Sequence, residues 1–143
     1  FNTIGPRQSA KYGMVVPRLI ASALSGRDLE VYGDGEQTRV FCHVNDAIAG
    51  VISIVDSEKS IGDVFNVGGF GEISILSLAQ RVIQLTNSNS KIKLVPYIDA
   101  YPVGYEDMQR RVPDNSKLRK LTGWQAKIDL DEAILDIAKS LTL

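Results

Sequence analysis

Two arginine-bearing segments contain the residues of this chain best suited to hold an anion. Arg39 follows the turn tripeptide Gly33-Asp34-Gly35, and Arg110 and Arg111 precede a short predicted helix. A guanidinium presents several N–H donors in one plane, which matches the geometry of phosphate and carboxylate groups. Taken alone, each segment also fits the interpretation that its arginines are charged side chains on a solvated surface.

An aromatic side chain stands beside the first of these segments. Tyr32 ends a short apolar run, and the whole segment Leu29–Phe41 is typical of a β-hairpin that turns at residues 33–35. An aromatic ring can form one wall of a pocket for a planar nucleoside base. The alternative is an ordinary half-buried strand residue.

The sequence offers little for nucleophilic or metal chemistry. Cys42 is the only cysteine and His43 the only histidine, too few for a zinc site of Cys and His ligands. Cys42 has no evident base partner, so we interpret it as a packing residue. We interpret His43 as a core residue and Asp46 as a helix cap, and we predict no catalytic residue and no metal ligand in the chain.

Composition fits one globular domain over residues 1–143. The chain is 44% hydrophobic and 23% charged, and its formal net charge of -1 gives no basic excess for nucleic-acid binding. No apolar run approaches the roughly 20 residues that span a bilayer, so no membrane partner is expected. With a single cysteine and no disulfide, the expected location is cytoplasmic.

Apolar periodicity predicts a small α/β unit. Ser74 and Asp129 are expected caps, as are Asp114 and either Asn45 or Asp46. In the predicted helix over residues 45–55, Ala47, Ile48, Val51, Ile52 and Val55 are expected to lie on one apolar stripe. Besides the hairpin, helices are predicted over residues 12–24, 45–55, 74–85, 114–121 and 130–141, strands over 64–67 and 92–96, and a loop over 97–112.

Several of these motifs together resemble the nucleotide-sugar epimerases and dehydratases of the extended short-chain dehydrogenase/reductase superfamily. The resemblance covers essentially the whole chain. It rests on residues 1–6 with Asn2, on 29–41, on the element Arg39-x-Phe41-x-x-Val44-x-Asp46, and on Arg111-x-Pro113-Asp114-x-Ser116-Lys117 followed by Leu121-Thr122-Gly123-Trp124.

The resemblance implies that the chain is the carboxyl-terminal, substrate-binding part of such an enzyme, a fragment without the Rossmann domain. It implies a UDP-sugar as ligand, and it is closest to the UDP-glucose 4-epimerase-like enzymes, so the first expectation is a UDP-hexose 4-epimerase. The alternatives are a UDP-glucuronate decarboxylase, a dTDP-glucose 4,6-dehydratase, or a non-catalytic module that binds sugar nucleotides. Glu30 stands at a position where the dTDP-sugar dehydratases tend to have proline. Met108 stands at a position where the sugar-nucleotide decarboxylases tend to have proline.

The resemblance also assigns the site residues. Arg39 and Arg111 would hold the diphosphate from two sides, with Arg110 as the alternative to Arg111, and His43 matches a histidine of several 4-epimerases. The full set of expected substrate-binding residues is Asn2, Val15, Val16, Val31, Tyr32, Arg39, Arg111 and Arg110.

Two family features do not occur in these 143 residues: the glycine-rich turn that receives NAD and the Tyr-x-x-x-Lys pair. We therefore expect this chain to bind no cofactor and to be inactive alone, with NAD bound by the full-length enzyme, which is expected to be a homodimer. An exposed apolar face is expected near Phe1 and the first helix, where the cofactor domain would pack.

Overall fold

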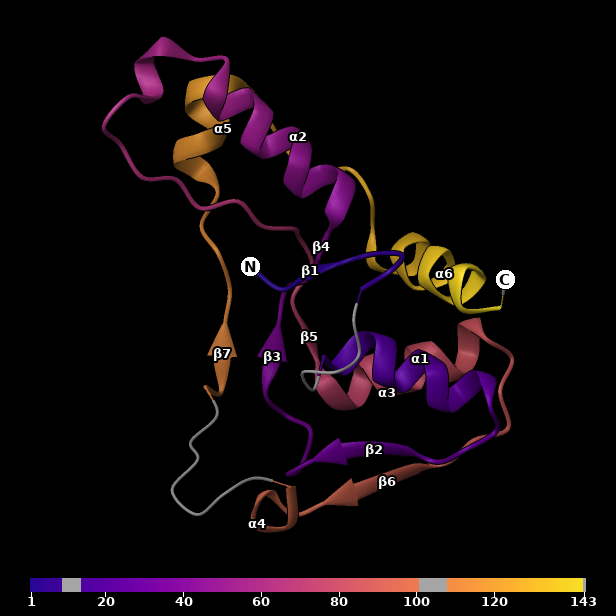
Figure 1. Cartoon of the computed structure of the whole chain (residues 1–143). Coiled ribbons are helices and arrows are strands. Elements are labelled where there is room, and N and C mark those ends of the chain that lie inside the picture. Colours follow the sequence, from indigo (N-terminus) through magenta and orange to yellow (C-terminus); the bar gives the residue numbers. More distant parts are fainter. Residues whose placement is uncertain (9–13, 101–107, 143) are drawn as a thin grey trace.

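The computed structural model describes residues 1–8, 14–100 and 108–142 as an α/β unit, which confirms the predicted fold class (Figure 1). Its strands are short and fall into three small sheets. In chain order the elements are β1 (Thr3–Ile4), α1 (Val15–Leu24), β2 (Leu29–Tyr32), β3 (Thr38–Arg39), β4 (Cys42–His43), α2 (Val44–Val55), η2 (Glu58–Ser60), β5 (Ile73–Ser74), α3 (Ile75–Leu85), β6 (Ile92–Val95), α4 (Tyr97–Ala100), β7 (Arg110–Arg111), α5 (Ser116–Thr122) and α6 (Leu130–Leu141).

The main core lies where α1, α3 and α6 pack together above the parallel pair β2–β6 (Figure 1). Each helix contributes the apolar residues that recur every three or four positions, as the periodicity predicts. Burying them away from water is the main force that holds these elements together. The fully buried large side chains here are Val16, Leu19, Ile20, Leu29, Val31, Leu78, Val82, Ile134 and Ile137.

The predicted hairpin at residues 33–35 is wrong. β2 pairs with β6, whereas β3 pairs with β5 and β7 in another sheet. Gly33 and Gly35 both have left-handed backbones, with φ of 70° and 77°. A side chain at Gly33 would collide with the Tyr97 ring, so the two glycines allow a sharp turn that carries the chain from one sheet to the next.

The predicted helix with its apolar stripe is present as α2, and most of the stripe is exposed. Val51 and Ile52 are 52% and 53% exposed, and Val55 is 76% exposed. The inner side of α2 is formed instead around Gly50, which lies against Val67 and Trp124.

Exposed apolar side chains also occur near the first helix, as predicted: Phe1, Met14 and Leu24 are 43%, 43% and 39% exposed. Among the described residues, the more exposed apolar face is that of α2.

Residues 64–67 form no strand, contrary to the prediction, and Val64 is 80% exposed. The segment then passes close to β4: a Cβ on Gly69 would lie 1.9 Å from the carbonyl oxygen of Phe41. None of the described strands pairs with residues 64–67.

The helix caps agree with the predictions in part. The Ser74 hydroxyl accepts the Ser77 N–H at 3.1 Å, and Asp129 accepts the Glu132 N–H at 2.9 Å, as predicted. The cap of α5 is Asn115 by position, while the Asp114 carboxylate accepts the Ser116 N–H at 2.8 Å.

The N-terminus of α2 differs from the prediction. His43, rather than Asn45 or Asp46, is the cap, because its Nδ1 accepts the Asn45 N–H at 3.3 Å. The buried Asp46 carboxylate accepts the N–H groups of Lys127 and Ile128 at 2.9 and 2.8 Å. Asp46 thus links α2 to the segment that leads into α6.

Helix α6 occupies the predicted residues, and β6 lies within the predicted strand 92–96. The predicted start of the first helix at Tyr12 lies outside the described residues. Within the described ranges, no helix is both long and apolar enough to cross a bilayer.

The two hydrogen bonds that the Asp46 carboxylate accepts predict that removing it will strongly reduce the stability of the fold. Asp46→Ala should lower the free energy of unfolding by about 3 kcal/mol, since two partly buried hydrogen bonds lose their charged acceptor. Asp46→Asn should cost less because it keeps an acceptor oxygen. Chemical denaturation measures both, with Asp56→Ala at the exposed end of the same helix as the control. Equal stability of Asp46→Ala and the control would contradict this role.

Candidate functional site

Arg39 and Arg111 are register partners in the parallel pair β3–β7. Register partners on adjacent strands are about 4.8 Å apart and direct their side chains to the same face of a sheet. The structure therefore brings together two arginines that are 72 positions apart in the sequence, on one side of the sheet β5-β3-β7. Like charges in this arrangement repel, so the pair favours an anion near both.

Arg39 is nearly covered by the protein, with 7% of its surface exposed. Its Nη1 donates to the carbonyl oxygen of Thr38 at 2.7 Å. Such enclosure restricts where the guanidinium can lie and lowers the screening of its charge by water.

Arg111 is half-buried, and its Nη2 donates to the side-chain oxygen of Asn2. The same Asn2 side chain donates from Nδ2 to the carbonyl oxygen of Val40 at 2.8 Å. The buried Nε of Arg111 has no hydrogen-bond partner, and no described carboxylate forms an ion pair with Arg111. A buried donor without a partner is unfavourable, and an acceptor atom of a bound molecule is one group that could satisfy it.

Arg110 has a different environment. It is the register partner of Thr38 and directly precedes Arg111 in β7. Because alternate residues of a strand point to opposite faces, Arg110 and Arg111 lie on opposite faces of the sheet. The Arg110 guanidinium donates to Glu72 through Nε and Nη2, both at 2.9 Å, and Thr38 donates its hydroxyl to the same carboxylate at 2.5 Å. These bonds, first that from Arg110, lower the pKa of the exposed Glu72 carboxyl. The geometry thus separates two arginines that the sequence left as alternatives.

The residues that follow Arg111 contact Gly68 and Gly69, and no sequence motif predicts these contacts. Asn115 donates its side-chain amide to the carbonyl oxygens of Gly68 and Gly69, at 2.8 and 3.3 Å. The Pro113 ring lies against Gly68, where a Cβ would be 2.4 Å away. Nothing in the sequence signals these partners, because they are more than 40 residues apart.

The four residues predicted to line a nucleoside pocket differ in how far they are buried. Val16 and Val31 are 1% and 0% exposed and pack in the core, so their side chains offer no free surface to a base. Val15 and Tyr32 are half-buried. The Tyr32 ring lies under the Arg18 guanidinium, whose carbon is 4.3 Å from the ring centroid. A pocket formed by these residues stays a prediction.

Cys42 and His43 do not form a catalytic pair. Burial, and next the charge of Asp46, raises the pKa of the Cys42 thiol to about 11, so the thiol is protonated at neutral pH. The buried His43 ring bonds Asp136 through Nε2 at 3.2 Å and serves as the α2 cap through Nδ1. Among the described residues, no group of three acidic, histidine or cysteine side chains is arranged for a metal ion.

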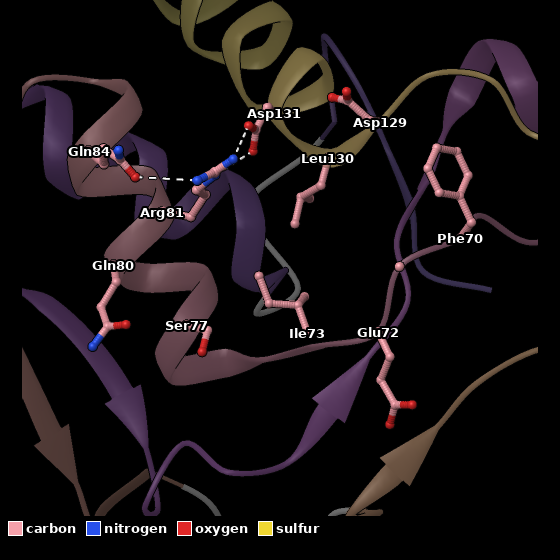
Figure 2. A pocket seen from close by; sticks show the side chains of 11 residues that line it. Phe70, Glu72, Ile73, Ser77, Gln80, Arg81, Gln84, Asp129, Leu130 and Asp131 are labelled. Carbon is pink, nitrogen blue, oxygen red and sulfur yellow. Dashed lines mark hydrogen bonds and ion pairs between the residues drawn. The ribbon is translucent and has the colours of Figure 1, made fainter.

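A surface pocket of about 550 Å³ opens between α3 and the start of α6 (Figure 2). Two of its charged side chains are paired, since Arg81 donates to Asp131 through Nε at 2.6 Å, and Arg81 also donates to Gln84 at 3.4 Å. None of the predicted substrate-binding residues lines it. Its lining includes Ile73, the register partner of Arg39 in β5, but neither Arg39 nor Arg111 itself.

Comparisons with known proteins agree with this fold. A family model described as GDP-mannose 4,6 dehydratase matches residues 1–137. The chain is 42% identical, over 135 residues, to a UDP-N-acetyl-alpha-D-glucosaminuronate decarboxylase of Bacillus cytotoxicus, covering 94% of this chain and 42% of that protein. It is 37% identical over 134 residues to UDP-glucuronic acid decarboxylase 3 of Arabidopsis thaliana, covering 94% and 37%.

The structure also superimposes on a UDP-glucuronic acid 4-epimerase of Bacillus cereus solved with UDP-glucuronic acid and NAD. The TM-score is 0.87 at 25% identity, over 99% of this chain and 43% of that one. The chain thus spans about two fifths of the length of these relatives. It belongs to the family of nucleotide-sugar dehydratases described as GDP-mannose 4,6 dehydratase, and it corresponds to the carboxyl-terminal part of an extended short-chain NAD-dependent epimerase/dehydratase.

Proposed function

We propose that this chain binds the nucleoside diphosphate of a UDP-sugar, with Arg39 and Arg111 bridging the diphosphate. The observation that carries the proposal is their register pairing on one face of β3–β7. Two planar guanidinium groups next to each other supply several N–H donors to several phosphate oxygens. The buried, unpartnered Nε of Arg111 supports the proposal, because a phosphate oxygen would satisfy it.

The substrate we propose is a UDP-sugar that carries a carboxylate. The decarboxylases of Bacillus cytotoxicus and Arabidopsis thaliana and the 4-epimerase of Bacillus cereus are all named for UDP-linked uronic acids. The identities favour decarboxylation as the reaction of the full-length enzyme, and the 4-epimerase expected from the sequence stays the second candidate. The cytoplasmic location and the homodimer also stay predictions.

The family implies NAD, and the residues of this chain do not fit a site for it. The glycine-rich run 68–71 does not open a helix, since β5 lies between it and α3. Gly69 is pressed against the Phe41 carbonyl group, so its backbone is not open to a pyrophosphate. We therefore assign hydride transfer to the remainder of the full-length enzyme. The contribution of this chain is to hold the nucleotide so that only the sugar moves, which uses binding energy far from the reacting carbon for orientation.

The exposed face of α2 is the surface that we propose packs against that remainder. Ile48, Val51, Ile52 and Val55 form a continuous apolar stripe, and Val64 on the unpaired segment 64–67 is exposed as well. Contiguous exposed apolar surface is typical of an interaction site. The relatives have more than half of their length outside the matched region, enough for a domain that would cover this face.

The paired arginines predict a selective loss of affinity. In the full-length protein, Arg39→Ala and Arg111→Ala should each weaken UDP binding by about 2 to 4 kcal/mol, because each removes a charged donor from an enclosed anion. Uridine, which lacks phosphates, should bind all variants alike. Isothermal titration calorimetry measures both ligands.

Arg110→Ala is the matched control, since Arg110 bonds Glu72 on the opposite face. It should change UDP binding little. Wild-type affinity for UDP in both the Arg39→Ala and the Arg111→Ala protein would contradict the proposed site. An equal loss in all three variants would instead indicate a general effect of positive charge.

The α2 face predicts a second effect. A Val51→Ser/Ile52→Ser double variant should destabilise the full-length protein by about 2 kcal/mol, since both side chains would lose apolar contact with the covering domain. Solvent-exposed residues away from interfaces usually change stability by less than about 0.5 kcal/mol. Chemical denaturation distinguishes the two cases, with Leu141→Ser at the exposed end of α6 for comparison. Near-neutral behaviour of the double variant would show that the face is open to water.

A further inference from the structure

We propose that residues 64–67 form a β-strand in the full-length protein by pairing with the segment that directly precedes Phe1 in that protein. The relatives have more than half of their length outside the matched region, and this chain corresponds to their carboxyl-terminal part. In such a protein the remainder of the enzyme leads into Phe1. The inference assigns one segment to one edge of this chain, and it does not depend on the proposed diphosphate site.

The side chains of residues 64–67 already alternate as they do in a strand. Val64 and Asn66 are exposed, whereas Phe65 and Val67 are half-buried. Successive side chains of a strand point to opposite faces, and valine and phenylalanine favour strands. The segment has no strand partner among the described residues. It therefore lacks a neighbouring backbone rather than a suitable sequence.

One edge of this segment is covered by side chains. The Val64 N–H donates to the Asp63 carboxylate at 2.8 Å, and the Val64 carbonyl oxygen accepts from Lys117 Nζ at 3.0 Å. The Lys117 Nζ also lies over the Phe65 ring, 4.8 Å from its centroid. Charged side chains at a strand edge discourage pairing with a further strand. We call this the outer edge.

The opposite, inner edge is open and lies next to the start of this chain. Backbone groups of alternate residues in a strand point to the same edge, so those of Phe65 and Val67 lie opposite those of Val64. On the inner edge the Phe1 nitrogen donates to the Val67 carbonyl oxygen at 3.1 Å. Within the described part of the chain, the Phe65 N–H and C=O and the Val67 N–H make no hydrogen bond. These three groups are therefore available to a strand that continues from Phe1.

Strand β1 has an edge that matches. It pairs in parallel with β4, where the Asn2 carbonyl oxygen accepts the Cys42 N–H at 3.2 Å. Because backbone groups alternate, Phe1 turns its own groups to the other edge, toward Val67. From β4 the chain passes through α2 and returns beside β1 (Figure 1), which is the helical crossover that parallel strands need. The expected order is β4, β1 and 64–67, all parallel.

The Phe1–Val67 hydrogen bond also sets the register of the proposed strand. In a parallel ladder, a residue donates to one residue of the next strand and accepts from the residue two positions later. The second residue before Phe1 should therefore donate to the Phe65 carbonyl oxygen and accept the Val67 N–H. The fourth should accept the Phe65 N–H. β1 then lies in the middle of a parallel sheet that joins the remainder of the enzyme to β4, which begins three residues after Arg39.

Amide hydrogen exchange in the full-length protein, followed by NMR, tests this pairing residue by residue. The Phe65 and Val67 amides should be protected at least about 100-fold more than the Asn66 amide, because only the first two would belong to the ladder. Equal protection of all three would show simple burial under another domain, and equally fast exchange would show an open edge. Protection that rises with protein concentration would show pairing with a second copy. Each of these three results would overturn the proposal.

Proline variants of the full-length protein test the same edge through thermal denaturation. Val67→Pro removes an N–H from the proposed ladder, so it should lower Tm by about 5 °C more than Val67→Ala does. Val64→Pro is the matched control, because the Val64 N–H donates to an exposed carboxylate on the outer edge. It should lower Tm by less than about 2 °C relative to Val64→Ala. Equal shifts for the two prolines would contradict the pairing, and if Val67→Pro does not fold, the exchange pattern of the wild-type protein decides.

Discussion

The parallel pairing of β3 with β7 is the interaction on which the site depends. It consists of two residues on each strand, yet it fixes which arginine of the pair 110–111 lies beside Arg39. A shift of one residue in this register would exchange Arg110 and Arg111 between the two faces. The bonds of Glu72 to Arg110 and Thr38 hold the register on one face, and the contacts of Asn2 hold Arg111 on the other.

This short strand pair is supported by elements from distant parts of the sequence. The turn at Gly33-Asp34-Gly35 directs the chain from the β2–β6 pair into β3, and the close approach of Gly69 to Phe41 brings residues 68–69 within reach of Asn115. Helices α1, α3 and α6 lie on the side of β3 away from β7 (Figure 1), and Ile73, the register partner of Arg39, packs against their core. The apolar core and the proposed diphosphate site thus use different residues of one fold.

Local signals predicted much of the fold. The periodic apolar residues and the Ser74 and Asp129 caps placed α3 and α6 correctly, because helix formation depends on neighbours within four residues. Strand pairing depends on distant partners, so the turn at residues 33–35 was taken for a hairpin although its two strands belong to different sheets. The stripe on α2 shows a related limit: periodicity identifies an apolar face but not the element that covers it. Likewise, the arginine motifs indicated an anion site, while the choice between Arg110 and Arg111 required the register.

A crystal structure of the full-length protein with bound UDP tests the central claim most directly. The account predicts phosphate oxygens within hydrogen-bond distance, about 2.7 to 3.2 Å, of nitrogens of both Arg39 and Arg111. It also predicts that Arg110 stays hydrogen-bonded to Glu72. A diphosphate bound elsewhere, or held by Arg110 in place of Arg111, would contradict the account.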